Sequence, residues 1–583
     1  MRPTAPFVLL DDARDGGAPA RLYRDPVEVI EAREIGDVLP ALDRIRAATQ
    51  GGLHAAGFLA YATGGAFEAK APQRSGDPLL WFGLFEGFER FDPATLPDPR
   101  GVWVGECEPL MQRSAYLEKL AAIQELIAAG DLYQANLTFQ AAVRFEGDPL
   151  ALYARLRTAS KAGWGAYIDT GVDRHLSLSP ELFFALEAGQ LTCKPMKGTA
   201  PRLPDPSDDA AAGEALRSDP KQRAENLMIV DLMRNDLSRV AEPGSVQVPD
   251  LFAIETYPTV QQMVSTVTAT LAQNKDAIDV LAALFPCGSI TGAPKLRARQ
   301  AIDAIERCDR GLYTGSIGRI DPGGDAQFNV AIRTLTVRGH DDHATLGIGS
   351  GIVADSHGPD EWDECLTKAA FLSRGARPFD LIETMAFDPE QGLQRLDLHL
   401  ERMSASAATF GFAFDRHMVR NELQAATFRL CQPSKVRLLV SPSGAVAIEV
   451  GPLPSVPLDS VPVAIVPLPV ERHDFRLRHK TTDRIFYDAA RRDAGTFEVV
   501  FADRDGWLTE GSFTSIFAER GDTLLTPPLA RGLLAGVLRR DMIDRGDAIE
   551  GDLQASDLQE GFWIGNAVRG LLRAHVAVRS DEG

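Results

Sequence analysis

Cysteine is scarce in this sequence of 583 residues, and long apolar runs are missing altogether. The 6 cysteines form no CxxC pair and no Cys/His spacing of the zinc-binding kind, so we expect reduced thiols. No apolar run approaches the ~18 residues that a membrane-spanning helix needs, and the first residues lack the apolar core of a signal peptide. The sequence therefore predicts a cytoplasmic protein that does not act at a membrane.

Positive charge is also in short supply. The chain has 61 Lys and Arg against 81 Asp and Glu, so its formal net charge is −20. Such a balance argues against nucleic acid or an anionic membrane as the main partner. It does not argue against a small anionic substrate, which needs only a local basic pocket. The length is enough for two or more domains with full cores.

Short apolar runs that read as strands alternate with helical patterns along the chain, which predicts an α+β protein. Ser114 to Ala129 is one predicted helix, with Ser114 as its cap. Asp219-Pro220 predicts the start of a second helix, because Asp caps well and Pro suits the first helical position. The side chains that we expect this helix to turn toward the core are Leu227, Val230, Met233 and Leu237.

Lys197 lies in the segment Pro195–Thr199, where an apolar run meets a glycine. Glycine permits a sharp turn, and a turn can hold one amine against a ligand. A single lysine is more often a solvated surface charge. As a nucleophile it must be neutral, and lowering its pKa from about 10.4 to about 7 takes roughly 4–5 kcal/mol. Burial or a nearby cation can supply that energy, so a nucleophilic Lys197 predicts a dry pocket, a metal site, or both.

Several charged residues further along the first half suggest a site for an anion and a metal. Glu361 and Glu364 are one helical turn apart and share a face. Together with a third carboxylate on another helix they would suit Mg²⁺, which prefers oxygen ligands. Arg333 lies inside an apolar strand, where a guanidinium needs a carboxylate or phosphate partner.

The second half begins after the junction Arg374–Pro378 and has strand and helix patterns of its own. Lys480 stands among polar neighbours, Glu510 lies at the return of a predicted hairpin, and glycines precede a helix near Val537. A lysine, a carboxylate and a helix N-terminus are the minimum for pyridoxal phosphate: an imine, a partner for the pyridine nitrogen and a phosphate seat. Each residue alone is more often structural.

Residues from about 55 to 374 resemble the chorismate-utilising enzymes, the family of anthranilate synthase component I, aminodeoxychorismate synthase component I and isochorismate synthase. The resemblance implies an antiparallel β-sandwich with surrounding helices. It also implies that Glu225 and Glu364 ligate Mg²⁺, with Glu361 close by, and that the metal holds the ring carboxylate of chorismate. The motifs that carry the resemblance are Gly130–Leu137, Ser179–Glu181, Pro195–Thr199, Ala224–Leu237, Gly292–Lys295, Ile332–Thr334 and Gly351–Ser356.

The same resemblance implies a seat for the rest of chorismate. Arg333, Tyr313 and the backbone of Gly351 would hold the enolpyruvyl carboxylate, and Thr291 would line the ring site. Two departures from the family pattern affect this expectation. Gln262 stands where the family usually has His and cannot move a proton as His can, and Ser350 replaces Ala or Gly.

Within this family the residue at position 197 separates the chemistries. Anthranilate and isochorismate synthases carry alanine there, and aminodeoxychorismate synthases carry lysine. The resemblance thus implies that Lys197 attacks the ring at C2 and that Glu181 protonates the departing C4 hydroxyl. Gln134, where isochorismate synthases place a lysine to activate water, favours ammonia as the incoming group. Anthranilate synthesis is the alternative that Lys197 argues against. No tryptophan-binding motif is visible, so feedback inhibition by tryptophan is not expected.

The order and spacing of the second half resemble the fold-type IV pyridoxal-phosphate enzymes over about 378–575. The resemblance implies a two-subdomain α+β fold, with Lys480 as the Schiff-base lysine and Glu510 as the partner of the pyridine nitrogen. The residues that it assigns to the phosphate are Arg402, Gly536, Val537 and Leu538. That family often has Asn at the position of Ser515 and Thr at the position of Leu538, and both changes remove a polar contact.

Together the two resemblances imply a bifunctional enzyme with domains at 1–374 and 380–583 and a linker at 375–379. The first would turn chorismate and ammonia into 4-amino-4-deoxychorismate. The second would eliminate pyruvate to give para-aminobenzoate for folate biosynthesis. No glutamine amidotransferase segment is visible, so a separate subunit would supply the ammonia. A homodimer through the second domain is compatible with the resemblance. The alternative for the second half is an aminotransferase or a non-catalytic interaction module.

Overall fold

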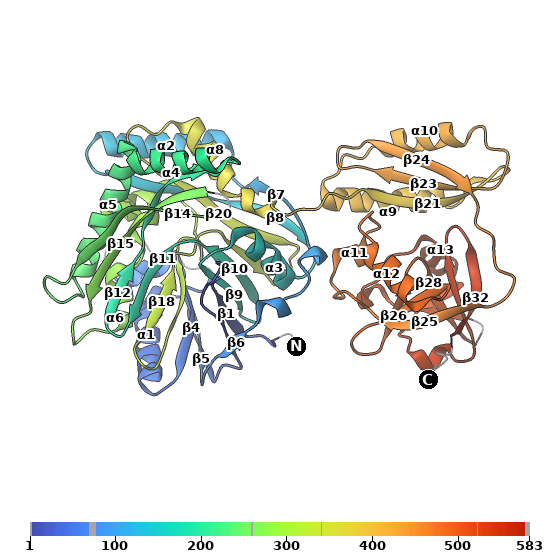
Figure 1. The fold of residues 1–583 in the computed structure, drawn as a ribbon, viewed down its shortest axis with the longest axis horizontal. Helices are drawn as coiled ribbons and strands as arrows, with labels where there is room; N and C mark the ends of the chain where they lie inside the picture. Colours follow the sequence, from blue (N-terminus) through green and yellow to red (C-terminus); the bar gives the residue numbers. More distant parts are fainter. Residues whose placement is uncertain (1–2, 69–76, 258–259, 340, 522, 578–583) are drawn as a thin grey trace. The chain divides into compact units, whose positions relative to one another are not determined.

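The structure is a computed structural model that describes residues 3–68, 77–257, 260–339, 341–521 and 523–577. The chain divides into two compact units, and Figure 1 colours it along the sequence from blue at the N-terminus to red at the C-terminus. The first unit comprises Met1–Leu96, Glu106–Phe145 and Leu152–Gly375, and the second comprises Pro97–Gly105, Glu146–Ala151 and Ala376–Gly583. No helix in the described ranges is long and apolar enough to cross a membrane.

The first unit is built on two ten-stranded sheets whose paired strands are all antiparallel, which confirms the predicted β-sandwich. One sheet runs, in spatial order, β16 (Gly292–Ala293), β8 (Gln134–Glu146), β20 (His343–Ile352), β19 (Thr334–Arg338), β10 (Asp173–Ser179), β9 (Trp164–Asp169), β1 (Phe7–Asp11), β2 (Ala20–Arg24) and β6 (Glu89–Phe91), with β7 (Trp103–Pro109) beside β8. The other runs β13 (Met196–Pro201), β15 (Val260–Thr270), β12 (Gln190–Cys193), β11 (Leu182–Glu187), β18 (Ala326–Asn329), β17 (Ser316–Ile320), β4 (His54–Leu59), β5 (Leu80–Phe85) and β3 (Glu28–Ala32), with β14 (Gln247–Thr256) beside β15.

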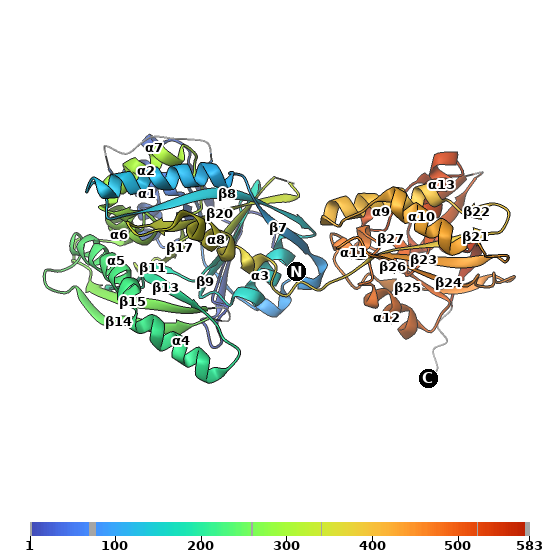
Figure 2. The ribbon, with the colours of Figure 1, turned by 90° about the horizontal axis from the view of Figure 1, so that it is seen from above.

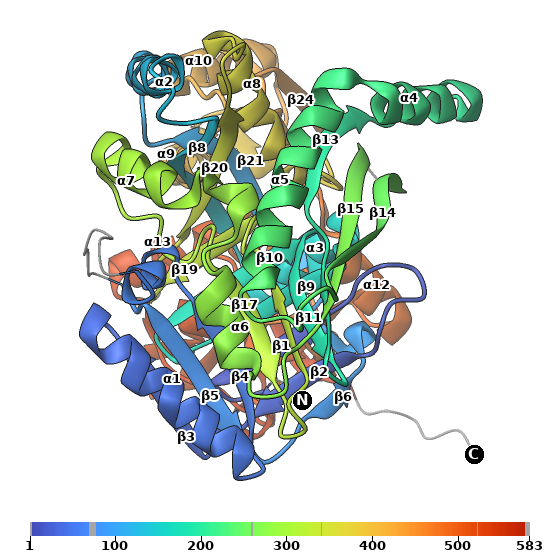
Figure 3. The ribbon, with the colours of Figure 1, turned by 90° about the vertical axis from the view of Figure 1, so that its left-hand side faces the viewer.

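Eight helices of the described residues surround these sheets. They are α1 (Ile35–Gln50), α2 (Arg113–Ala128), α3 (Pro149–Ser160), α4 (Pro206–Ser218), α5 (Pro220–Ser238), α6 (Ala277–Leu284), α7 (Lys295–Glu306) and α8 (Gly358–Lys368). Helix α2 lies beside α8 and α7, as the view from above shows (Figure 2). Helix α5 lies along β13 and β15, with α4 at the end of the same strands (Figure 3). This places α5 directly over the strand that carries Lys197.

Helix α5 begins as the sequence predicts, because the Asp219 side chain accepts a hydrogen bond from the Gln222 N–H and Pro220 is the first helical residue. The prediction for one of its four core residues is wrong, because the Leu227 side chain is exposed. The cap of α2 is also wrong, since Ser114 lies inside the helix and its N-cap is Gln112, with no side-chain hydrogen bond. Periodicity finds the apolar stripe of a helix but not the width of its contact with the sheet.

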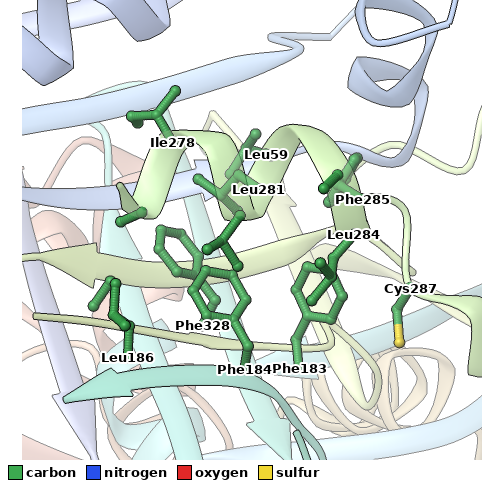
Figure 4. Close-up of a cluster of buried hydrophobic side chains, with 14 of the residues drawn as sticks. Leu59, Phe183, Phe184, Leu186, Ile278, Leu281, Leu284, Phe285, Cys287 and Phe328 are labelled. Atoms are coloured by element: carbon green, nitrogen blue, oxygen red, sulfur yellow. The ribbon is translucent and has the colours of Figure 1, made fainter. Parts of the chain in front are cut away.

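An aromatic core fixes the strand that follows Glu181. Phe183 and Phe184 on β11 lie beneath α6, where Phe184 stacks on Phe328 with ring centroids 5.3 Å apart (Figure 4). Cys287, at the far end of α6, belongs to the same buried cluster. Each fully buried Phe contributes roughly 1.5–3 kcal/mol to folding. The cluster therefore anchors both chain segments that lead into the site, the one at Glu181 and the one at Ser289.

The second unit has two sheets, which confirms the predicted two-subdomain α+β fold. The four-stranded sheet runs β22 (Gly392–Leu393), β21 (Leu381–Asp388), β23 (Ser434–Val440) and β24 (Val446–Pro452). The mixed eight-stranded sheet runs β27 (Leu508–Gly511), β26 (Glu498–Ala502), β25 (Val461–Pro467), β32 (Gly570–Val576), β31 (Phe562–Asn566), β28 (Ser515–Arg520), β29 (Thr523–Thr526) and β30 (Ala548–Glu550). The helices are α9 (Leu396–Phe410), α10 (Arg416–Thr427), α11 (Phe475–Arg478), α12 (Ile485–Ala494) and α13 (Val537–Arg545).

Candidate functional sites

Lys197 sits on an irregular stretch of β13. Met196 pairs with Val264 and Thr199 with Gln262, so the register shifts between them and leaves Lys197 and Gly198 out of the regular ladder. Gly198 has φ +91°, and a Cβ there would lie 3.0 Å from Oε1 of Gln222. Only glycine fits this backbone without strain. A local bulge of this kind re-aims a side chain, here the lysine next to it.

Neighbouring polar side chains hold this bulge in place. The Gln262 amide donates to the Gly198 carbonyl (2.8 Å) and accepts from the Thr199 hydroxyl (3.0 Å). Asn226 on α5 donates to the Lys197 carbonyl (3.5 Å) and accepts from Ser265 (2.6 Å). Gln262, which replaces the usual histidine of the family, therefore cross-links two strands in this protein.

The Lys197 amine points into the protein. A Cβ built at Gly351 would lie 3.1 Å from Lys197 Nζ and would touch the Gln134 amide, so these three groups meet. Burial lowers the pKa of the Lys197 amine, the Lys368 charge lowers it further, and three glutamates act against this shift. The glutamates are Glu225, Glu181 and Glu364. A dry pocket and a nearby cation are the two conditions that a nucleophilic lysine requires.

Glu181 is the buried acid next to this amine. Its Oε1 accepts a hydrogen bond from the Ser289 hydroxyl (2.7 Å), and its backbone N–H bonds to Ser179 (3.2 Å). Burial raises the pKa of Glu181 to about 7, although Ser289 and the Lys197 charge act in the opposite direction. A carboxyl group with this pKa is half protonated near neutral pH, which suits a general acid.

The three predicted metal ligands come from two helices, Glu225 on α5 and Glu361 and Glu364 on α8. Burial raises the pKa of Glu225, and the Glu361 charge adds to that rise. The Ser356 hydroxyl donates to Glu361 (2.7 Å), and Glu364 is paired with Lys368 (2.8 Å). Among the described residues no three acidic, His or Cys side chains are close enough to form a ready-made cage. The donor chemistry nevertheless suits Mg²⁺, because carboxylate oxygens are the ligands that this hard cation prefers.

Arg333 and Tyr313 carry free polar groups. Arg333 has φ +51°, an uncommon conformation for a residue other than glycine. Within the described ranges, neither its guanidinium nor the Tyr313 hydroxyl has a hydrogen-bond or ion-pair partner in the protein. A largely enclosed guanidinium without a partner is suited to a carboxylate. Thr291, in contrast, donates to the Cys287 carbonyl (2.8 Å) and stabilises its own loop.

Gln134, the first residue of β8, is buried and incompletely bonded. Its Oε1 has no hydrogen-bond partner within the described ranges, and its amide nitrogen lies against Gly351. A buried acceptor without a partner is costly, so it indicates a place where a ligand donates a hydrogen bond. The predicted residues Gln134, Gly351, Lys197 and Glu181 thus lie together.

Lys480 is the buried amine of the second unit. Burial lowers its pKa to about 7, helped by Arg402, Arg484 and Arg437 and opposed by Glu383. Glu510 accepts a hydrogen bond from the Tyr487 hydroxyl (2.5 Å) and one from the Leu534 N–H (3.2 Å). Burial raises the pKa of Glu510 to about 7. The buried amine and the buried carboxyl group that the sequence predicts for a pyridoxal phosphate site are thus both present.

The predicted phosphate seat is at the start of α13. Gly536 is its N-cap, and Arg402 donates to the adjacent Ala535 carbonyl (2.9 Å). A Cβ at Gly536 would lie 2.6 Å from the Ser515 hydroxyl, so the glycine leaves room there. Leu538 packs its side chain into a buried cluster with Phe517 and contributes only its backbone N–H. Free N–H groups at a helix N-terminus suit an anion without help from side chains.

Sequence reasoning missed the residues that hold Arg402. Glu383 on β21 accepts two hydrogen bonds from the Arg402 guanidinium (2.8 and 2.7 Å) and one from His399 (2.6 Å). Burial disfavours its charge, but Arg402 and His399 outweigh burial and hold the pKa of Glu383 below its usual range. The available signals were an acid inside an apolar strand and a histidine three residues before Arg402, on the same helix face. Ser289 and Lys368 were missed in the first unit.

Three buried polar atoms near Lys480 lack hydrogen-bond partners within the described part of the chain: His399 Nε2, Thr481 Oγ1 and Arg484 Nη1. Buried polar atoms are nearly always bonded in proteins, so such a group indicates a polar ligand. The residues present therefore fit pyridoxal phosphate.

Comparison with known families agrees with this geometry. The profile described as chorismate binding enzyme matches residues 6–374, more than half of the chain, and the profile described as amino-transferase class IV matches residues 380–576. The chain belongs to the chorismate binding enzyme family and carries a class IV aminotransferase domain, which implies pyridoxal phosphate.

Individual relatives cover the first half. Aminodeoxychorismate synthase component 1 of Klebsiella aerogenes is 46% identical over 258 residues, 44% of this chain and 57% of that protein. Anthranilate synthase component 1 of Streptomyces coelicolor is 38% identical over 268 residues, 46% of this chain and 52% of that protein. The crystal structure of anthranilate synthase component I from Streptococcus pneumoniae is 25% identical with a TM-score of 0.53, and the match covers 64% of this chain and 93% of that one. The chain therefore spans little more than half the length of these curated relatives.

Proposed function

We propose that this chain converts chorismate and ammonia to 4-amino-4-deoxychorismate and then eliminates pyruvate to give para-aminobenzoate. The observation that carries the proposal is Lys197, a buried amine that lies with Gln134, Gly351 and Glu181. Lysine at this position is the feature that distinguishes aminodeoxychorismate synthases from the other members of the family. We also propose that residues 1–374 and 380–583 act as two catalytic domains.

In the first reaction, the neutral Lys197 amine adds to C2 of the ring and the double bonds shift. Glu181 gives its proton to the C4 hydroxyl, which leaves as water. Ammonia then adds at C4, the double bonds shift back, and Lys197 leaves C2 with its electron pair restored. Gln134 Oε1, which has no hydrogen-bond partner in the described ranges, would accept a hydrogen bond from the incoming ammonia.

The two carboxylates of the substrate need separate binding sites. Glu225, Glu361 and Glu364 would hold Mg²⁺, which would bind the ring carboxylate and neutralise charge there. The Arg333 guanidinium and the Tyr313 hydroxyl, which have no hydrogen-bond partner in the described ranges, would bind the enolpyruvyl carboxylate.

Ammonia would come from a separate glutamine amidotransferase subunit. This part of the proposal is supported by relatives whose names describe them as component 1 of an aminodeoxychorismate synthase. Excess ammonia should replace that subunit in the assay.

In the second reaction, bound pyridoxal phosphate supplies an electron sink conjugated with the substrate amine. Lys480 removes the proton from C4 of the ring, the C3–O bond breaks, and enolpyruvate leaves while the ring becomes aromatic. Glu510 would hold the pyridine nitrogen, and Arg402 with the N–H groups of Val537 and Leu538 would hold the phosphate. Glu383 fixes the Arg402 fork through two hydrogen bonds.

Product analysis tests the assignment of the first half. Wild type with chorismate, Mg²⁺, ammonia and pyridoxal phosphate should form para-aminobenzoate, and Lys197→Ala should lose at least about 10²-fold in rate because the covalent route is gone. Lys194→Ala is the matched control, since Lys194 pairs with Glu255 on the partly exposed side of the same segment. Anthranilate as the wild-type product would overturn the assignment.

A further inference from the structure

Arg484 follows Lys480 by four residues and stands at the start of α12. Its guanidinium is held on two sides. Nη2 donates to the Ser512 carbonyl (3.3 Å), and the guanidinium carbon lies 4.2 Å from the centre of the Tyr487 ring. Stacking on an aromatic ring and a backbone hydrogen bond fix the plane of the group.

One edge of this fixed group is left without a partner. Nη1 of Arg484 is buried and makes no hydrogen bond within the described part of the chain. Leaving a buried donor of a charged group unpaired is unfavourable, and a rigidly held one cannot turn toward water. The arrangement suits an anionic acceptor that arrives with a ligand.

The position of Arg484 narrows the choice of acceptor. Its charge acts both on the Lys480 amine and on the Glu510 carboxyl, and the Tyr487 ring beneath it donates its hydroxyl to Glu510. In pyridoxal phosphate, the ring nitrogen lies opposite the ring carbon whose aldehyde group forms the imine with the lysine. The phenolate oxygen lies on one edge between these two positions, and the phosphate arm lies on the other.

The phosphate edge already has its groups, Arg402 and the start of α13. We propose that Nη1 of Arg484 donates a hydrogen bond to the phenolate oxygen of pyridoxal phosphate and so sets the acidity of the imine formed with Lys480. The inference rests on the proposed cofactor site. A guanidinium beside the phenolate stabilises its negative charge and so disfavours a proton on the neighbouring imine nitrogen.

The experiment is a pH titration of the visible absorbance of the cofactor in the full-length holoenzyme, without substrate. Arg484→Gln should raise the midpoint by about one unit or more, because a positive charge has been removed. Arg484→Lys keeps the charge but not the forked, planar guanidinium, so it should raise the midpoint by less than Arg484→Gln does. Arg491→Gln is the control: Arg491 is on the same helix and also bonds Ser512 (3.4 Å), but its charge is not among those acting most strongly on Lys480.

The outcomes separate the inference from the function on which it rests. A wild type that takes up no pyridoxal phosphate would overturn the proposed cofactor site itself. An unchanged midpoint in Arg484→Gln, with the cofactor bound and normal melting, would overturn the inference. A rise in substrate KM without a midpoint shift would assign the guanidinium to a substrate carboxylate instead. If Arg484→Gln does not fold, an unchanged midpoint in Arg484→Lys overturns the inference equally.

Discussion

At the scale of single residues, the protonation states of Lys197 and Glu181 depend on the same property of the site, its burial. The reaction needs a neutral amine and a neutral acid side by side at the same pH. Burial disfavours the charged form of both groups, so it lowers the pKa of the amine and raises that of the acid to about 7. The same dry environment therefore prepares the nucleophile and the proton donor.

Glu181→Gln tests this pair. The variant should lose roughly 10²–10⁴-fold in first-half activity, because the amide cannot give up a proton. The stability of wild type relative to this variant should fall as the pH rises. Burial raises the folded-state pKa of Glu181 from 4.5 to about 7, so wild type loses stability as the pH rises through this range, by roughly 3 kcal/mol in all. Thermal melting should therefore show Glu181→Gln to be more stable than wild type at pH 8, by more than at pH 5. An equal difference at both pH values would contradict a buried acid.

At the scale of elements, the bulge in β13 converts a strand residue into a nucleophile. A regular strand would alternate its side chains between the two faces of the sheet. The register shift between Met196 and Thr199, held by Gln262 and Asn226, breaks that alternation at Lys197. The positive φ of Gly198 is what makes the shift possible.

Gly198→Ala should therefore impair the site more than the fold. The Cβ would lie 3.0 Å from Gln222 and would strain the positive φ, at a cost of about 1–2 kcal/mol. A small displacement of Lys197 should lower first-half activity by roughly 10²-fold. Gly189→Ala is the control, because Gly189 has φ +78° with no atom within 4 Å of its Cβ. Melting curves should show a similar loss of stability in Gly198→Ala and Gly189→Ala. The ammonia-dependent assay should show a loss of activity in Gly198→Ala only. Comparable activity in the two variants would argue against the bulge as the device that aims Lys197.

What the sequence could predict differs between elements and sites. Capping chemistry correctly predicted the start of α5 at Asp219-Pro220, because the signal is local. The burial of Leu227 was predicted wrongly, because it depends on how wide a face the sheet covers. For the sites, motif resemblance supplied Lys197 and Lys480. It did not supply Glu383 or Ser289, because each meets its partner only after the chain folds: Glu383 is 19 residues from Arg402, and Ser289 is 108 residues from Glu181.

At the scale of the whole molecule, each unit contains the residues proposed for its own reaction. Lys197 and Glu181 belong to the first unit, and Lys480 and Glu510 belong to the second. Neither set draws a side chain from the other unit. The two activities should therefore be separable by single substitutions in the full-length chain.

Lys480→Ala should accumulate 4-amino-4-deoxychorismate from chorismate and ammonia, and Lys197→Ala should convert supplied 4-amino-4-deoxychorismate to para-aminobenzoate. An equimolar mixture of the two variants should form para-aminobenzoate from chorismate, measured by chromatography. Lys435→Ala, an exposed substitution in the second unit, should behave as wild type. If each variant keeps its own half-reaction and the mixture forms no product, the intermediate does not leave the chain that makes it.

The inward-facing side chain of Leu538 has a consequence for finding similar enzymes. Because the anion at the start of α13 would be held by Arg402 and main-chain amides, its binding would not depend on the hydroxyl often found at this position. A motif search that insists on that hydroxyl would discard competent members of the family, whereas one that asks for a glycine-capped helix beside a clamped arginine would retain them.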